Sequence, residues 1–121
     1  MSEGQGGKLT THVLDVRLGG PARDLEFTLF RIDGKERQPI GSGRTNNDGR
    51  AGRPLVEGDA FVPGTYELEF AVGAYQARHL EVGATGFYDL IPIRFLVSDS
   101  SAHYHVPLLL SPFGYSTYRG S

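Results

Sequence analysis

Hydrophobic and polar residues alternate along several short segments of this chain. In residues 25–29, LEFTL, apolar side chains take every second position, and residues 65–70, TYELEF, and 91–97, IPIRFLV, repeat the arrangement. Successive side chains of a strand point to opposite faces, so the apolar side chains of each segment should share one face of a sheet. Pro92 cannot donate a ladder hydrogen bond and predicts an edge strand or a bulge.

Glycine, proline, asparagine and aspartate separate these segments. The expected turns are RLGGPARD, RIDGKERQ, TNNDGR and FVPGTY. Roughly seven or eight strands divided by such turns are typical of an all-β sandwich or barrel. The helix that the pattern favours is short and covers residues 73–80, where Tyr75, His79 and Leu80 recur at helical spacing.

The length and charge of the chain limit its organisation and its partners. A chain of 121 residues suits one domain, which buries roughly two-thirds of the surface exposed when unfolded. Residues 1–7, MSEGQGG, carry little apolar surface to offset their ordering entropy, so we expect a flexible leader before a single domain over residues 8–121. The formal net charge is -2 and the 12 Lys and Arg residues are scattered, which disfavours a nucleic-acid partner.

The absence of cysteine removes several kinds of chemistry. Disulfides, a thiol nucleophile and thiolate metal ligands are all excluded. The sequence also lacks a run of roughly 20 apolar residues that could span a bilayer, and it starts without the apolar segment of a secretory signal. We therefore expect no membrane partner and a cytoplasmic location, with the peroxisome as the alternative in a eukaryote.

Three histidines are candidates for chemistry. His103 and His105 stand two apart in the strand-like run HYHVPLLL, so both should point away from the face that Tyr104 takes. His12 lies within KLTTHVLDV, where a half-buried structural histidine is the alternative. The three suit zinc by ligand type, but their spacing is not diagnostic of a zinc site. We assign no role to His79.

An arginine and the closing segment supply further candidates. Arg50 follows the TNNDGR turn, and its permanent charge and fork of donors suit an anionic or carbonyl-rich planar substrate; the alternative is a solvated loop charge. In YSTYRGS, alternation predicts one shared face for every second residue from Tyr115 to Ser121, against the alternative of a frayed tail. The sequence contains neither a Gly-x-Ser-x-Gly elbow nor a P-loop.

These segments together resemble a known family. LTTHVLD, TNNDGR and AHYHVPLLLSPFGYSTYRGS make residues 8–121 similar to the transthyretin-like 5-hydroxyisourate hydrolases, and the closing YRGS looks like the signature that separates these enzymes from the hormone-carrying transthyretins. The resemblance implies a β-sandwich of two four-stranded sheets with one short helix. It also implies a homotetramer, a dimer of dimers with active sites in the channel between the dimers. We expect no cofactor and no metal.

The resemblance further implies a reaction and its residues. The reaction is hydrolysis of 5-hydroxyisourate to 2-oxo-4-hydroxy-4-carboxy-5-ureidoimidazoline in urate catabolism. The catalytic residues would be His12, Arg50, His105 and Ser121, with His103, Tyr118, Arg119 and Gly120 binding the substrate.

Each implied role has a physical basis. Histidine, whose ordinary pKa is near 6.5, suits proton transfer from water, and the sequence leaves open whether His105 or His12 is the general base. Arg50 would hold the substrate and offset negative charge developing on oxygen. The hydroxyl and carboxylate of Ser121 would orient the substrate, the water or a histidine.

Two alternatives to this enzyme remain open at the level of sequence. One is a transthyretin-like carrier that holds a small aromatic ligand without catalysis; His12, Arg50 and the YRGS ending argue against it, because a carrier needs apolar channel walls and no general base. The other is a metal-dependent hydrolase that uses His12, His103 and His105 as ligands.

Overall fold

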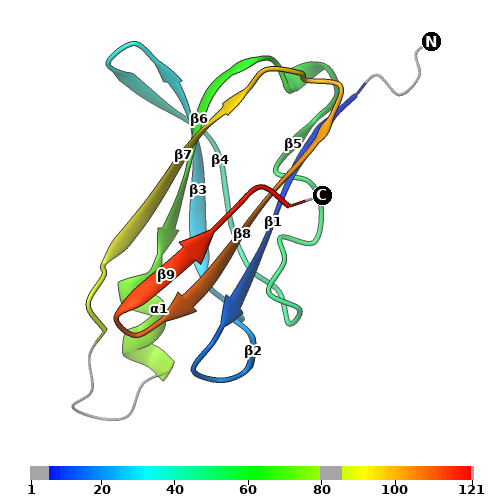
Figure 1. The fold of residues 1–121 in the computed structure, drawn as a ribbon. Coiled ribbons are helices and arrows are strands. Elements are labelled where there is room, and N and C mark those ends of the chain that lie inside the picture. Colours follow the sequence, from blue (N-terminus) through cyan, green and yellow to red (C-terminus); the bar gives the residue numbers. More distant parts are fainter. Residues whose placement is uncertain (1–5, 80–85, 121) are drawn as a thin grey trace.

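Two β-sheets pack face to face in the computed structural model, which describes residues 6–79 and 86–120 (Figure 1). Among these residues there is one α-helix, α1 (Val72–His79), and one 3₁₀ turn, η1 (Gly58–Ala60). The strands are β1 (Lys8–Asp15), β2 (Gly20–Pro21), β3 (Glu26–Asp33), β4 (Glu36–Arg44), β5 (Val56–Glu57), β6 (Gly64–Ala71), β7 (Leu90–Val97), β8 (His103–Ser111) and β9 (Gly114–Thr117).

The strand order confirms the predicted sandwich. One sheet, called sheet A, has the order β2-β1-β8-β9, and β5 also pairs with β1; the other, sheet B, has the order β4-β3-β6-β7. The fifth strand of sheet A was not expected, because β5 has only two residues and therefore no alternation to read. The predicted helix is α1, except that Leu80 lies outside the described residues. β7 is an edge strand, one of the two possibilities that Pro92 predicted.

Alternating apolar residues from both sheets fill the space between them. The segments identified by their pattern supply Phe27, Leu68 and Ile91, none of which is more than 5% exposed, and sheet A supplies Leu9 and Leu108, both fully buried. Each such side chain stabilises the fold by about 1.5–3 kcal/mol relative to leaving it exposed. None of the helices in the described ranges is long and apolar enough to cross a membrane.

The parallel pairing of β1 with β8 positions the candidate residues. Lys8 pairs with His103 and Thr10 with His105, and the pairing continues to the end of β1 at Asp15. Residues 1–5 of the predicted leader lie outside the described residues, whereas the buried Gly7 donates its N–H to the Ser100 carbonyl oxygen at 2.9 Å. The outer face of sheet A therefore carries side chains from both ends of the chain.

A buried carboxylate ties the end of β1 to α1. Asp15 is 4% exposed, and its Oδ2 accepts a hydrogen bond from the Tyr75 hydroxyl at 2.8 Å. Its Oδ1 accepts the backbone N–H groups of Arg17 at 3.0 Å and Leu18 at 3.3 Å. Burial, with the Asp15 carboxylate beside it, raises the pKa of Tyr75, so this hydroxyl stays protonated and donates.

We expect Tyr75→Phe to lower the free energy of unfolding by about 1–3 kcal/mol, because it leaves one oxygen of the buried Asp15 carboxylate without its donor. Urea unfolding followed by circular dichroism measures the change. Tyr115→Phe is the control, since Tyr115 is 39% exposed and its variant should differ by no more than about 0.5 kcal/mol. Equal stability of Tyr75→Phe and the parent chain would contradict this account.

Candidate active site

A cleft of about 520 Å³ lies over β1, β8 and the loop that follows Thr45. Its basic side chains, Lys8, Arg50 and Arg53, outnumber its one carboxylate, Asp48. It is lined by Lys8, Thr10, Thr11, Asn46, Asp48, Arg50, Ala51, Gly52, Arg53, Pro54, His103 and His105. This excess of positive charge favours an anionic or carbonyl-rich ligand.

The histidine pair of β8 shares one face, as the alternation predicted. Tyr104 between them is buried in the core, while the two imidazole centroids lie 6.1 Å apart. The hydroxyl of Thr10 lies between the rings, with Oγ1 2.7 Å from Nε2 of His103 and 2.8 Å from Nδ1 of His105. One threonine therefore contacts both candidate histidines.

The TNNDGR turn holds Arg50 beside β1. The Asn46 side-chain oxygen accepts the backbone N–H groups of Asp48 at 2.9 Å and Arg50 at 3.1 Å. Gly49 has a φ of 76° and lies so close to β1 that a Cβ there would be 2.4 Å from the Val13 carbonyl oxygen. Its own carbonyl oxygen accepts the N–H of Val13 at 2.8 Å. Only glycine fits, and the turn is fixed to the strand that carries His12.

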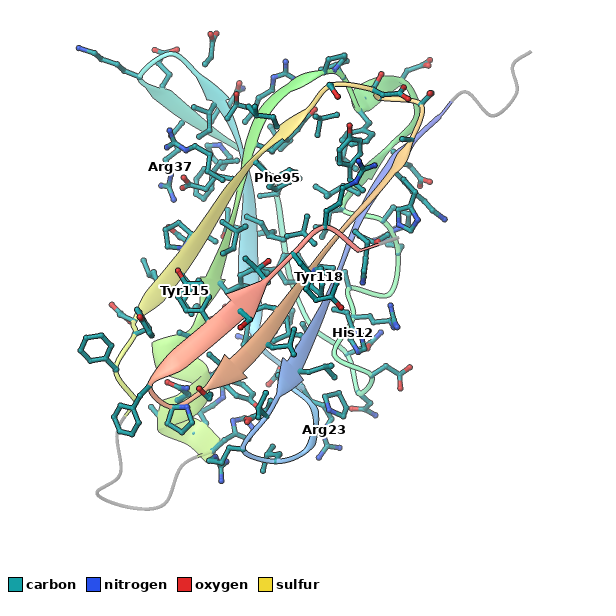
Figure 2. All side chains as sticks on the ribbon, in the orientation of Figure 1. His12, Arg23, Arg37, Phe95, Tyr115 and Tyr118 are labelled. Atoms are coloured by element: carbon teal, nitrogen blue, oxygen red, sulfur yellow. The ribbon has the colours of Figure 1, made fainter. Side chains whose placement is uncertain are left out.

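His12 faces this turn from the middle of β1 (Figure 2). It forms an isolated bridge with Arg50, and its Nε2 lies 2.8 Å from the Asp48 carbonyl oxygen. A carbonyl oxygen only accepts, so Nε2 carries the proton and Nδ1 is the only ring nitrogen that can accept one. His105 differs, because its partner is a hydroxyl that can either donate or accept.

Burial and neighbouring cations keep the β8 imidazoles neutral. Burial, followed by the charges of Arg50, His103 and His12, lowers the pKa of His105 below its ordinary 6.5. Burial, together with Lys8 and Arg119, likewise lowers the pKa of His103. Both rings are therefore uncharged at neutral pH and can accept a proton there.

The chain after β9 continues beside β8, and Gly120 forms an isolated backbone bridge with His105. The backbone N–H of Gly120 donates to the His105 carbonyl oxygen at 2.7 Å. A Cβ at Gly120 would lie 2.6 Å from Cδ2 of the His105 ring, so glycine is the residue that permits this approach. Gly120 thus restrains one edge of the ring, and Thr10 restrains another.

Tyr118 and Arg119 do not line this cleft, although Nη2 of Arg119 donates a hydrogen bond to the His103 carbonyl oxygen at 3.4 Å. Both line a second cleft of about 310 Å³, whose other residues include Ile93, Phe95 and Tyr104. The Arg119 guanidinium carbon is 4.1 Å from the Tyr104 ring centroid, which places this side chain at the core-facing side of sheet A. The alternation predicted for the closing segment assumed a strand that continues to Ser121, whereas β9 ends at Thr117 and the adjacent Tyr118 and Arg119 line the same cleft. Ser121 lies outside the described residues.

The cleft therefore gathers some predicted residues and adds others. Arg50, His103 and His105 line it. His12 forms a backbone bridge with Arg50, and Gly120 forms one with His105, whereas Tyr118 and Arg119 do not line the cleft. The sequence reasoning missed Thr10 and Lys8, although alternation from His12 places both on its face of the strand. Within residues 6–79 and 86–120, no three His, Asp or Glu side chains are grouped closely enough to hold a metal ion.

The fold and the cleft define a small β-sandwich protein with a histidine and arginine site. A profile of the HIUase/Transthyretin family matches residues 9–120. A 5-hydroxyisourate hydrolase from Ralstonia nicotianae is 55% identical over 116 residues, which cover 95% of this chain and 99% of that protein. The chain belongs to the HIUase/Transthyretin family.

Solved structures of a 5-hydroxyisourate hydrolase and of a transthyretin share this fold. The structure of Klebsiella pneumoniae 5-hydroxyisourate hydrolase matches with a TM-score of 0.80 and 32% identity, over 95% of this chain and 99% of that one. Transthyretin from Sparus aurata matches with a TM-score of 0.84 and 28% identity, over 93% of this chain and 96% of that one. Since the fold is common to both, the residues of the cleft must distinguish an enzyme from a carrier.

We expect Gly120→Ala to displace the His105 ring, because the new methyl group overlaps Cδ2, and to break the hydrogen bond between Thr10 and Nδ1. Imidazole nitrogen NMR shifts measure this change directly. Gly114→Ala is the matched control in the same segment, since its Cβ would lie 3.5 Å from the nearest atom, an ordinary contact. Unchanged His105 signals in Gly120→Ala would refute the packing argument.

Proposed function

We propose that this protein hydrolyses 5-hydroxyisourate to 2-oxo-4-hydroxy-4-carboxy-5-ureidoimidazoline, a step of urate catabolism. The observation that carries the proposal is a positively charged cleft that joins the neutral imidazole of His105 to Arg50, in a chain 55% identical to a 5-hydroxyisourate hydrolase. Water attacks one amide-like carbon of the substrate ring, the C–N bond breaks, the ring nitrogen takes a proton, and the new carboxyl group loses one.

His105 is the general base in this scheme. Its lowered pKa leaves it able to take a proton from water at neutral pH, and Thr10 and Gly120 hold its ring in place. His12 has a different part, because its Nε2–H is occupied by the Asp48 carbonyl oxygen. We assign His12 to orienting Arg50 and the substrate from the neighbouring strand.

Arg50 stabilises the charge that develops on the attacked carbonyl. Its guanidinium is positively charged at every working pH, and the turn around Asn46 fixes its backbone before substrate arrives. Ser121 follows Gly120, which contacts His105, and we assign its hydroxyl to orienting the substrate or the water.

The remaining predicted substrate-binding residues have more distant roles. Arg119 acts through His103. Nη2 of Arg119 donates a hydrogen bond to the His103 carbonyl oxygen at 3.4 Å, and the charge of Arg119 helps to lower the pKa of His103. His103 itself lines the cleft. Tyr118 is 60% exposed and is available to a neighbouring subunit or to the substrate.

The carrier alternative fits the cleft less well. Transthyretin-like carriage of an aromatic ligand would need apolar walls, whereas this cleft presents Lys8, Arg50 and Arg53 with two imidazoles. Tight binding of a planar aromatic molecule without turnover would favour the carrier.

We assign the working form to a homotetramer, a dimer of dimers in the cytoplasm. Large apolar side chains are exposed on the single chain, with Leu96 73%, Phe113 72% and Phe87 71% exposed, and exposed apolar surface of this kind is typical of subunit contacts. The cysteine-free sequence suits a reducing compartment.

The direct test follows 5-hydroxyisourate, made fresh from urate by urate oxidase, with and without the protein. Because this compound decays unaided, acceleration over the background is the signal. We expect kcat/KM to fall about 10²–10³-fold in Arg50→Ala and about 10²–10⁴-fold in His105→Ala. Ser121→Ala should also be slower. A parent chain that only matches the background rate would refute the hydrolase.

The pH dependence tests the environment of His105. Protonated imidazole cannot accept a proton, so kcat/KM should fall as the pH drops through the lowered pKa of His105. In Arg50→Gln, the fall of the residual kcat/KM on acidification should begin at a higher pH than in the parent chain. The reason is that removing a neighbouring cation raises the pKa of His105.

Arg53→Gln is the matched control for this profile. Arg53 lines the same cleft but is not among the charges that act on His105. In Arg53→Gln, kcat/KM should therefore fall on acidification at the same pH as in the parent chain, even if the maximal rate changes. An acid limb that moves to lower pH in Arg50→Gln would contradict the assignment.

A further inference from the structure

Thr10 occupies an unusual position between two imidazoles. Its Oγ1 lies 2.7 Å from Nε2 of His103 and 2.8 Å from Nδ1 of His105, both within hydrogen-bond distance. β1 and β8 fix this position through their backbone ladder, in which Thr10 pairs with His105. The arrangement links the two rings through a single hydroxyl group.

Counting protons limits how these bonds can be made. A threonine hydroxyl has one proton to donate, and a neutral imidazole carries its proton on one of two nitrogens. If Thr10 donates to one ring, it must accept N–H from the other. The proton position on His103 therefore depends on the proton position on His105.

One of the two arrangements suits the cleft. If His105 holds its proton on Nδ1 and donates it to Thr10, its Nε2 keeps a lone pair at the tip of a ring that lines the cleft. Thr10 then donates to Nε2 of His103. Arg50 is the first of the charges acting on His105, whereas Lys8 and Arg119 act on His103, so the free lone pair belongs on the ring nearer the substrate-holding arginine.

We propose that Thr10 is a positioning residue that holds the proton of His105 on Nδ1 and passes a proton between His105 and His103 during turnover. This inference rests on the proposed hydrolysis. It assigns a function to a threonine that the sequence reasoning passed over.

The proton transfers balance over the reaction. The oxygen of water bonds to the substrate carbon while its proton moves to Nε2 of His105. The Nδ1 proton of His105 then moves to Oγ1 of Thr10 as the Thr10 proton moves to Nε2 of His103, which places the positive charge on His103. When the C–N bond breaks, Nε2 of His105 gives its proton to the leaving nitrogen and the relay runs in reverse, which restores the starting state.

The first experiment is 15N NMR of the imidazoles near pH 8, with signals assigned by their loss in His103→Gln and His105→Gln. In the parent chain we expect His105 to be protonated on Nδ1 and unprotonated on Nε2. Thr10→Val keeps the β-branched shape but removes the hydroxyl, and His105 should then carry its proton on Nε2. Thr10→Ser, which restores a hydroxyl, should return the parent pattern. A parent His105 protonated on Nε2, or unchanged signals in Thr10→Val, would overturn the proposal.

The second experiment is kinetic. We expect Thr10→Val to lower kcat about 10–100-fold, a part of what general acid and base catalysis contributes, with KM changed less than about 2-fold and with Thr10→Ser restoring most of the rate. Thermal unfolding of both variants checks that a loss of rate is not a loss of fold. If the parent chain is active and Thr10→Val has the same kcat, the relay is overturned and the hydrolase assignment stands. A parent without catalysis would overturn the hydrolase and the relay together, while the ring signals would still report the proton position.

Discussion

The parallel ladder between β1 and β8 is the contact on which the rest of this structure depends. It pairs Lys8–Asp15, near one end of the chain, with the segment from His103 to Leu110, near the other. A slip of one residue would turn Thr10 and His12 into the core and would bring Leu9 and Val13, both fully buried, to the surface. The hydrophobic core therefore sets the register of the polar face, and the candidate site takes its geometry from the packing beneath it.

The second requirement is that segments from three parts of the chain meet without side-chain interference. Gly49 lets the TNNDGR turn approach Val13 closely, and Gly120 lets the closing segment approach the His105 ring. In both places a backbone hydrogen bond completes the contact. Functional groups held by strands and backbone bonds lose little freedom when a substrate binds, so the cleft is organised in advance.

Positive charge gives the cleft its chemical character. Burial, reinforced by the charges of Lys8 and Arg50, lowers the pKa values of His103 and His105 and leaves both rings able to accept a proton from water. The same charges attract a substrate rich in carbonyl oxygens and stabilise the negative charge that develops during attack. The charges that help to keep the histidines neutral are therefore also suited to stabilise an oxyanion.

The sequence by itself determined the strands of an all-β fold, because the alternation in LEFTL, TYELEF and IPIRFLV reflects the period of a strand and can be recognised without knowing which strands pair. The pattern left a sandwich or a barrel open, and the family resemblance of the motifs favoured the sandwich. It also placed His103 and His105 on one face and predicted α1 and the edge position of Pro92. Only the tertiary structure decided that Thr10 joins the two histidines and that Arg119 turns toward Tyr104. Periodicity describes one strand at a time, whereas these contacts depend on which strands pair and in which register, and that is fixed by residues far apart in the chain.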